Sequence, residues 1–305
     1  MSAMVTERYK PTRRMVIVFF SLAFAISWAI WSPLIFFPER SDQLTILPAI
    51  GSFGPFLAAI LTNLIYKDAG GLRQWLRSVF RWRIPFIWYL VGGLLLAVFQ
   101  ALLHVGLVAA LGSDLALATD PPWYYSLVAF PLNVIIATPI GSGMGEEPGW
   151  RGFALPALLE HLSPLSASIA LGAIWGIWHT PLLLSPGWSG REQGLWLLIY
   201  VIPLSIIYIW LYRESRGSAI PIILLHSSGN LYSSRLVSGS IVVMGTVLTA
   251  SPMLDFTILK TIVYSATALA IILATKGKLG YGQSTEGFPP VNKQVVSGQR
   301  QAQLH

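Results

Sequence analysis

Three short clusters of ionisable and amide side chains interrupt otherwise apolar stretches of this sequence. Their members are two carboxylates, one arginine, two histidines and one carboxamide: Glu146, Glu147 and Arg151, then His179, then His226 and Asn230. Ionisable side chains within the apolar segments of a membrane protein are costly, and they usually mark a functional site. A carboxylate can take a proton from water, and His and Asn can donate hydrogen bonds to the oxyanion that forms when an amide is attacked. The inventory therefore suits the hydrolysis of an amide bond.

Sequence spacing sorts these residues into roles. His226 and Asn230 are four positions apart, which places both side chains on one face of a helix. Glu147 also lies four positions before Arg151, in the favourable orientation for a helical ion pair, whereas Glu146 projects about 100° away. We therefore expect Arg151 to hold Glu147 and Glu146 to remain available as a general base, with a histidine orienting the attacking water.

Glycine and proline flank the two carboxylates. The run Gly-Ser-Gly-Met-Gly at 141–145 predicts a break that carries the chain around a reacting group. Pro148 suits the first turn of the helix that follows.

The same side chains also suit a metal site. One Glu and two His with a bound water form a known zinc ligand set, so zinc-assisted hydrolysis is an alternative to direct catalysis by a carboxylate. Cysteine is absent, which excludes thiolate ligands, a cysteine nucleophile and disulfides.

Water is not the main solvent of the chain that carries these clusters. Of its 305 residues 54% are hydrophobic and only 11% are charged, against about 25% charged in a typical soluble domain. Mean hydropathy is +0.63. Several apolar segments approach the roughly 20 residues that a spanning helix needs: 15–37, 44–66, 84–112, 123–142, 164–185, 194–212, 217–234 and 261–275. The alternation typical of barrel strands is absent, so we predict an all-α, polytopic bundle of about eight transmembrane helices.

The basic residues indicate the orientation of this bundle. Most of the 20 Lys and Arg residues fall on the side that also carries both ends of the chain, and the positive-inside rule makes that side cytoplasmic. We expect a cytoplasmic segment at 1–14, one integral membrane domain at 15–275 and a disordered polar tail at 276–305. Segment 15–37 is too long for the apolar core of a signal peptide and is interpreted as a retained helix. Residues 236–254 are expected to form an outer loop or a re-entrant segment.

Charge and hydropathy also predict the partners. Segment 67–85 interleaves basic residues with Leu, Trp and Phe, which predicts an amphipathic helix lying on an anionic lipid leaflet. Membrane lipids are thus expected partners. A nucleic-acid partner is not expected, because the positive-inside rule already accounts for the net charge of +7.

The three clusters, in this order and spacing, resemble the three motifs of the CPBP family. The motifs are Glu-Glu-x-x-x-Arg at 146–151, Trp-x-x-x-His at 175–179 and His-x-x-x-Asn at 226–230. This family contains the CAAX prenyl proteases and bacterial relatives that act in self-immunity or bacteriocin processing. The resemblance extends over most of residues 15–275. Each motif alone is a weak signal, whereas three of them in a fixed order are specific.

The resemblance implies a catalytic role for four residues. Glu146 would activate water with the assistance of His179, and His226 and Asn230 would bind the oxyanion. The residues that would support the architecture of the site are Glu147, Arg151 and Trp175. Trp175 is a departure, because the second motif of the family usually begins with Phe.

The catalytic type stays open at the level of the family, whose members are described both as metalloproteases and as metal-independent glutamate proteases. Asn230 is a poor zinc ligand but a good oxyanion donor. We therefore predict a site without a metal or another cofactor, and keep zinc as the alternative.

The function predicted from these observations is that of an intramembrane endopeptidase. It would hydrolyse a peptide bond of a membrane-associated or lipidated protein or peptide. The alternative is a non-catalytic immunity or scaffold protein that binds a peptide in the same cavity. A proton-coupled transporter is less favoured, because the sequence shows no inverted repeat of spans. His104 and His161 are assigned structural roles only.

Overall fold

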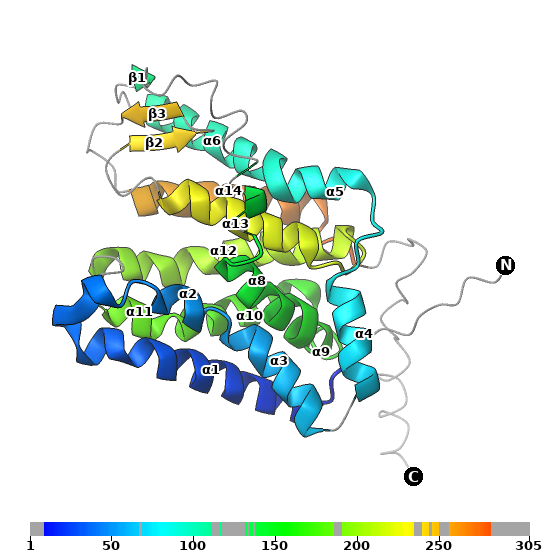
Figure 1. The fold of residues 1–305 in the computed structure, drawn as a ribbon. Helices are drawn as coiled ribbons and strands as arrows, with labels where there is room; N and C mark the ends of the chain where they lie inside the picture. The colour runs from blue at the N-terminus through cyan, green and yellow to red at the C-terminus, as the bar shows by residue number, and fades with distance from the viewer. Residues whose placement is uncertain are drawn as a thin grey trace, which may run out of the picture.

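The helices of this protein run side by side in a bundle (Figure 1). The computed structural model of the chain describes residues 9–66, 69–110, 116–117, 132, 134–136, 138–185, 191–234, 240–243, 246–249 and 256–281. The predicted all-α fold class is confirmed, with the addition of a small sheet at one end of the bundle. Most of the predicted span 123–142 lies outside the described residues.

The elements before the first site cluster are mainly helices of one to seven turns: α1 (Arg13–Phe36), η1 (Pro38–Gln43), α2 (Leu47–Gly51), α3 (Gly54–Ile65), α4 (Ala69–Val79), α5 (Phe86–Leu90), η2 (Val91–Leu95), α6 (Leu96–Ala110) and the two-residue strand β1 (Ala116–Leu117). The elements that carry the clusters and follow them are α8 (Ser142–Gly149), η3 (Trp150–Ala154), α9 (Leu155–Leu158), α10 (Pro164–Trp178), α11 (Thr180–Leu184), α12 (Arg191–Glu214), α13 (Ile220–Ser234), β2 (Ser240–Val243), β3 (Thr246–Thr249) and α14 (Phe256–Ala274).

Two of the predicted spans are broken helices. Residues 44–66 form α2 and α3, which are separated at Ser52 and Phe53. Residues 164–185 form α10 and α11, which are separated at His179. In both cases a proline stands in the first turn of the second helix, where its missing N–H is tolerated but the preceding helix cannot continue.

Length and composition identify the helices that can cross a membrane. Two stretches meet both criteria, Arg13–Phe36 and Leu47–Ile65. Shorter apolar helices occupy Ile87–Gln100, Pro164–Trp178 and Lys260–Ala274. The number of spans therefore remains a prediction.

The elements that carry the clusters lie in the middle of the bundle. In Figure 1, α8, α10 and α13 are flanked by α1 and α3 on one side and by α14, α5 and α6 on the other. Helix α8 packs against both α3 and α13, and α10 packs against α12. The sheet forms at the end of the bundle opposite α4.

Residues 236–254, expected to be a loop or a re-entrant segment, include a strand hairpin. Strands β2 and β3 pair antiparallel, with Ser240 opposite Thr249 and Val243 opposite Thr246, and β1 pairs with the other edge of β3. The described residues of this segment are strands and do not form a further spanning helix.

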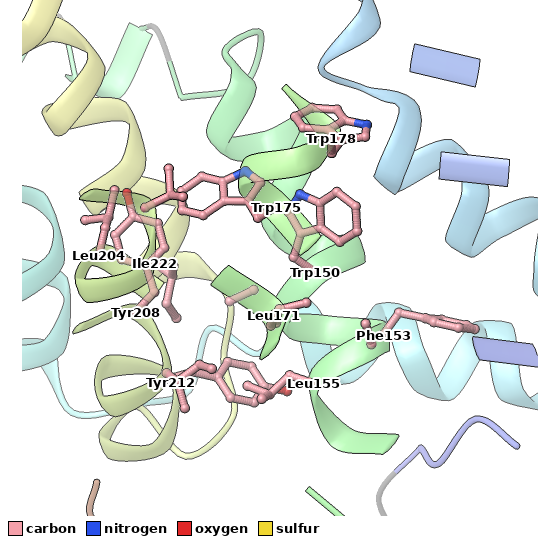
Figure 2. Packing of buried hydrophobic residues seen from close by; sticks show 14 of the residues in the cluster. Trp150, Phe153, Leu155, Leu171, Trp175, Trp178, Leu204, Tyr208, Tyr212 and Ile222 are labelled. Carbon is pink, nitrogen blue, oxygen red and sulfur yellow. The ribbon is translucent and has the colours of Figure 1, made fainter. Parts of the chain in front are cut away.

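Aromatic and aliphatic side chains fill the space between the helices around the site. Figure 2 shows Trp150 and Phe153 of η3, Trp175 of α10, and Tyr208 of α12 among them. All four are buried. The rigid packing of these large rings holds the polar side chains described below.

Glycines allow α8 to approach its neighbours closely. A Cβ at Gly145 would lie 2.6 Å from the backbone oxygen of Ser52, and one at Gly143 would lie 2.7 Å from the oxygen of Ile223. Only residues without a side chain fit at such distances. The break expected at 141–145 is present at its start, where a turn at 138–140 leads to the extended Gly141, and from Ser142 onward the run forms α8 and packs between α3 and α13.

Helix α4 runs across the end of the bundle rather than along it (Figure 1). It buries Trp75 and Val79 and exposes Arg73 and Arg77, so the amphipathic helix expected within 67–85 is present. Its end is fixed to the start of α13, where the amide of Ala219 donates to the Val79 carbonyl at 3.0 Å. Its contact with a lipid leaflet remains a prediction.

Candidate active site

Glu147 is the centre of a buried ionic cluster. Arg151 Nη1 lies 2.9 Å from Oε2 and 3.1 Å from Oε1 of this carboxylate, so the ion pair expected from the spacing is present. His226 Nδ1 lies 2.7 Å from the same Oε1. Helix α13 thereby attaches to α8 through one carboxylate. Arg151 and Glu147 have no exposed side-chain surface, which makes the pair sensitive to the loss of either partner.

The arginine of this cluster is enclosed by aromatic rings. Its Cζ lies 4.5 Å from the centroid of the Trp175 ring and 4.9 Å from that of Tyr208. Nη2 donates to Ser205 Oγ at 3.3 Å. Arg151 belongs to η3, a widened π turn that interrupts the helix directly after the carboxylates. Such turns often occur at functional sites.

Glu146 points to a different neighbour, as its 100° offset from Glu147 predicts. Trp175 Nε1 donates a hydrogen bond of 2.6 Å to Glu146 Oε2, and both side chains are buried. In the described part of the chain, this indole is the only hydrogen-bond donor to the carboxylate. The sequence motifs assign Trp175 an architectural role, and the structure adds a donor function. The signal is present in the sequence, since Trp has an N–H and the usual Phe does not.

The two histidines lie against the same indole. The ring centroids of His179 and His226 are 5.8 Å and 5.6 Å from that of Trp175. His179 follows the last turn of α10, and its Nδ1 lies 2.8 Å from the Trp175 carbonyl oxygen. A carbonyl can only accept, so Nδ1 carries the proton and Nε2 of the neutral ring is an acceptor.

A serine that sequence analysis did not single out completes the group. Asn230 Nδ2 donates to Ser142 Oγ at 2.5 Å, and the same oxygen lies 3.3 Å from His226 Nε2. Asn230 and His226 therefore meet at one atom, as expected for two residues on one face of α13. Ser142 lies four positions before Glu146, and this spacing is the only sequence signal that could have identified it.

Hydrogen-bond directions follow from the ionic cluster. Glu147 is paired with Arg151 and accepts from His226 Nδ1, which must therefore carry a proton. In the neutral ring Nε2 is then an acceptor. It can donate a hydrogen bond to an oxyanion only when the ring is an imidazolium.

The alternative of a zinc site stays a prediction. Among the residues that the structure describes, no group of three or more His, Asp or Glu side chains is arranged to hold a metal ion. Glu147 is already engaged by Arg151 and His226, and the third cluster offers an amide in place of a second carboxylate. No step below is assigned to a metal.

The site defines a class of protein. It is a helical bundle in which a buried Glu and two His lie around one indole, and an Asn contacts this group through Ser142. Residues 126–232 match the family described as type II CAAX prenyl endopeptidase, Rce1-like. All seven residues predicted for the site fall within this range. This region of the chain is therefore similar to the CPBP, or CAAX protease, family, in agreement with the resemblance of the three motifs.

A curated relative supports the same family. The chain is 34% identical over 93 residues to CAAX prenyl protease 2 of Methanococcus maripaludis. The aligned part is 28% of this chain and 34% of the relative, so the match spans about a third of the relative's length.

Proposed function

We propose that this chain is an intramembrane endopeptidase that cleaves a peptide bond of a membrane-associated or lipidated substrate. The observation that supports this proposal is the position of Glu146, which is buried beside the Trp175 indole that also contacts His179 and His226. A general base, an orienting group and hydrogen-bond donors for an oxyanion are the parts that amide hydrolysis needs.

In the proposed reaction, Glu146 takes a proton from a water molecule. The water oxygen then attacks the carbonyl carbon of the scissile peptide bond, and the electron pair of the C=O bond moves to the oxygen. His179 Nε2 accepts a hydrogen bond from the second O–H of the water and thereby orients the molecule. Collapse of the tetrahedral intermediate breaks the C–N bond, and the protonated Glu146 returns the proton to the leaving amine.

The negative charge on the tetrahedral intermediate is stabilised from α13. Asn230 Nδ2 already donates to an oxygen at this position, that of Ser142. His226 would add a second hydrogen bond from Nε2 when both ring nitrogens carry a proton, and Glu147 orients the ring through Nδ1. Glu147 and Arg151 thus serve to orient His226 and to hold α8 on α13.

The substrate class follows from the relative's name and from the position of the site. The relative is named CAAX prenyl protease 2, and a prenylated peptide is therefore one candidate substrate for this chain. Where prenylation is absent, a leader peptide or the tail of a membrane protein would take its place. In both cases the scissile bond must reach a site inside the bundle.

The test uses purified protein in detergent and a library of peptides with and without a prenyl group. Glu146→Ala and Glu146→Gln are compared with wild type, and Glu160→Gln, an exposed carboxylate paired with Lys10, is the matched control. We expect cleavage by wild type and by the control, and none by either variant of Glu146. Equal cleavage by all four proteins would dismiss Glu146 as the base.

Two further arms separate the alternatives. Cleavage that is lost with a chelator and restored by zinc would favour metal catalysis over the direct mechanism. Peptide binding by wild type without any cleavage would favour the immunity or scaffold protein.

A further inference from the structure

Ser142 occupies a position that the proposed mechanism leaves to the substrate. Its Oγ lies 2.5 Å from Asn230 Nδ2 and 3.3 Å from His226 Nε2, the two groups assigned to the oxyanion. An oxygen atom of the protein therefore stands where these groups converge. Neither the sequence motifs nor the family comparison assign a role to this serine.

The hydrogen-bond directions at Ser142 are determined by its neighbours. Because His226 Nδ1 donates to Glu147, Nε2 of the neutral ring accepts, and the Ser142 hydroxyl must supply the proton. Asn230 Nδ2 donates a hydrogen bond to a lone pair of Ser142 Oγ. The serine oxygen thus accepts from Asn230 in the same way as the carbonyl oxygen of a bound peptide would.

The position of this hydroxyl relative to the base is fixed by helix geometry. Ser142 precedes Glu146 by four residues in α8, so both side chains point from one face with their Cβ atoms about 5–6 Å apart. Close packing of Gly143 on Ile223 and of Gly145 on Ser52 prevents α8 from shifting. Only rotation about the Cα–Cβ bond can move the Ser142 hydroxyl.

We propose that Ser142 is a further catalytic residue, the hydroxyl donor of the oxyanion site. In the free protein its oxygen fills the site. When a peptide binds, the side chain rotates, Asn230 donates to the peptide oxygen instead, and the Ser142 O–H donates to the same oxygen as negative charge develops on it. This inference rests on the proposed function.

A different role for the same serine must be distinguished. Ser142, His226 and Glu147 also follow one another in the order of nucleophile, base and orienting carboxylate. A nucleophilic serine would form an acyl-enzyme and react covalently with a fluorophosphonate. The donor role predicts no such adduct.

The first experiment measures turnover. Ser142→Ala should lower kcat about 10²-fold, the usual cost of one oxyanion donor, with little change in KM. Ser142→Thr keeps the hydroxyl and should recover most of that loss. Ser32→Ala, in which the lost hydroxyl bonds only to the backbone of α1, is the matched control and should behave as wild type. An unchanged or higher kcat in Ser142→Ala would overturn the proposal, because the hydroxyl would then only fill space.

The second experiment measures binding and does not need turnover. A peptide whose scissile amide is replaced by a phosphinate presents a tetrahedral, anionic centre, and the parent peptide presents a planar one. In a Glu146→Ala background, Ser142→Ala should weaken phosphinate binding about 10²-fold and leave the parent peptide unaffected. Equal losses for both ligands, or none, would contradict a donor role.

The outcomes of the two proposals can be separated. If wild type binds peptides but cleaves none, the proposed function fails. If wild type cleaves peptides and Ser142→Ala keeps its preference for the phosphinate, only the assignment of Ser142 fails. A fluorophosphonate adduct that is present in wild type and absent in Ser142→Ala would replace the donor by a nucleophile.

Discussion

Two adjacent carboxylates in this protein have different surroundings. Glu147 accepts from Arg151 and from His226, whereas Glu146 accepts from Trp175. One helical step of about 100° sends them to different neighbours. Neighbouring residues of the same type can therefore be tested for separate functions.

Replacing each carboxylate by an amide should separate stability from activity. Glu147→Gln leaves Arg151 as an uncompensated buried charge and should lower the free energy of unfolding by about 3–5 kcal/mol. Glu146→Gln should abolish cleavage with a much smaller loss of stability. Thermal unfolding in detergent and peptide cleavage measure the two effects. Similar melting temperatures for both variants would contradict this division.

The contribution of the Trp175 indole can be tested by replacing it with Phe, the residue that is usual at this position in the family. Trp175→Phe removes the donor to Glu146 and keeps an aromatic ring beside both histidines. A hydrogen bond to a charged group contributes about 1.5–3 kcal/mol, so the melting temperature should fall. Cleavage should persist, because the family usually carries Phe here. A variant as stable as wild type would show that the bond contributes nothing to stability.

At the scale of elements, close helix packing determines where the site residues lie. Helix α8 carries Ser142, Glu146 and Glu147, and it touches α3 and α13 through glycines. The break between α10 and α11 leaves His179 beside the indole one turn earlier.

A methyl group at a packed glycine should therefore disturb the site from a distance. In Gly145→Ala the new Cβ would meet the backbone of Ser52, which cannot yield as a flexible side chain would. We expect a loss of about 1–3 kcal/mol and strongly reduced cleavage. Gly106→Ala in α6 is the control, because no described atom lies within 4 Å of its Cβ position. Equal effects of the two substitutions would show that α8 tolerates displacement.

At the scale of the whole molecule, contacts join several of the segments that carry basic residues. Lys10 pairs with Glu160 after α9, the Arg81 carbonyl accepts from Ser218 before α13, and the Arg213 guanidinium lies over the Tyr281 ring. These contacts bring together segments that the positive-inside rule assigned to the cytoplasm. The orientation itself remains a prediction.

The absence of cysteine makes this orientation directly measurable. Single cysteines can be introduced at Arg77 in α4 and at Lys278 after α14, and at Arg40 in η1 as the opposite control. In intact cells, a membrane-impermeant thiol reagent should label Arg40→Cys. It should label the other two variants only after the membrane is opened. Labelling of Arg77→Cys in intact cells would show that the orientation is opposite to the predicted one.

The properties that the sequence alone determined are local ones. The number of consecutive apolar residues predicts helices, and four-residue spacing predicts the ion pair between Glu147 and Arg151, because both depend on the geometry of a single helix. The resemblance of the three motifs to a family was visible for the same reason. Helix boundaries were predicted less well: the break expected at 141–145 is confined to Gly141, and Pro148, expected in the first turn of a helix, lies inside α8.

Only the tertiary structure decided which distant groups meet. The indole of Trp175 reaches a carboxylate 29 positions away, and Asn230 reaches a hydroxyl 88 positions away. Such contacts depend on how each helix is rotated against its neighbours and on how closely their backbones approach. Neither quantity is encoded in the periodicity of one segment, which is why the donor to Glu146 and the role proposed for Ser142 emerged from the packed bundle.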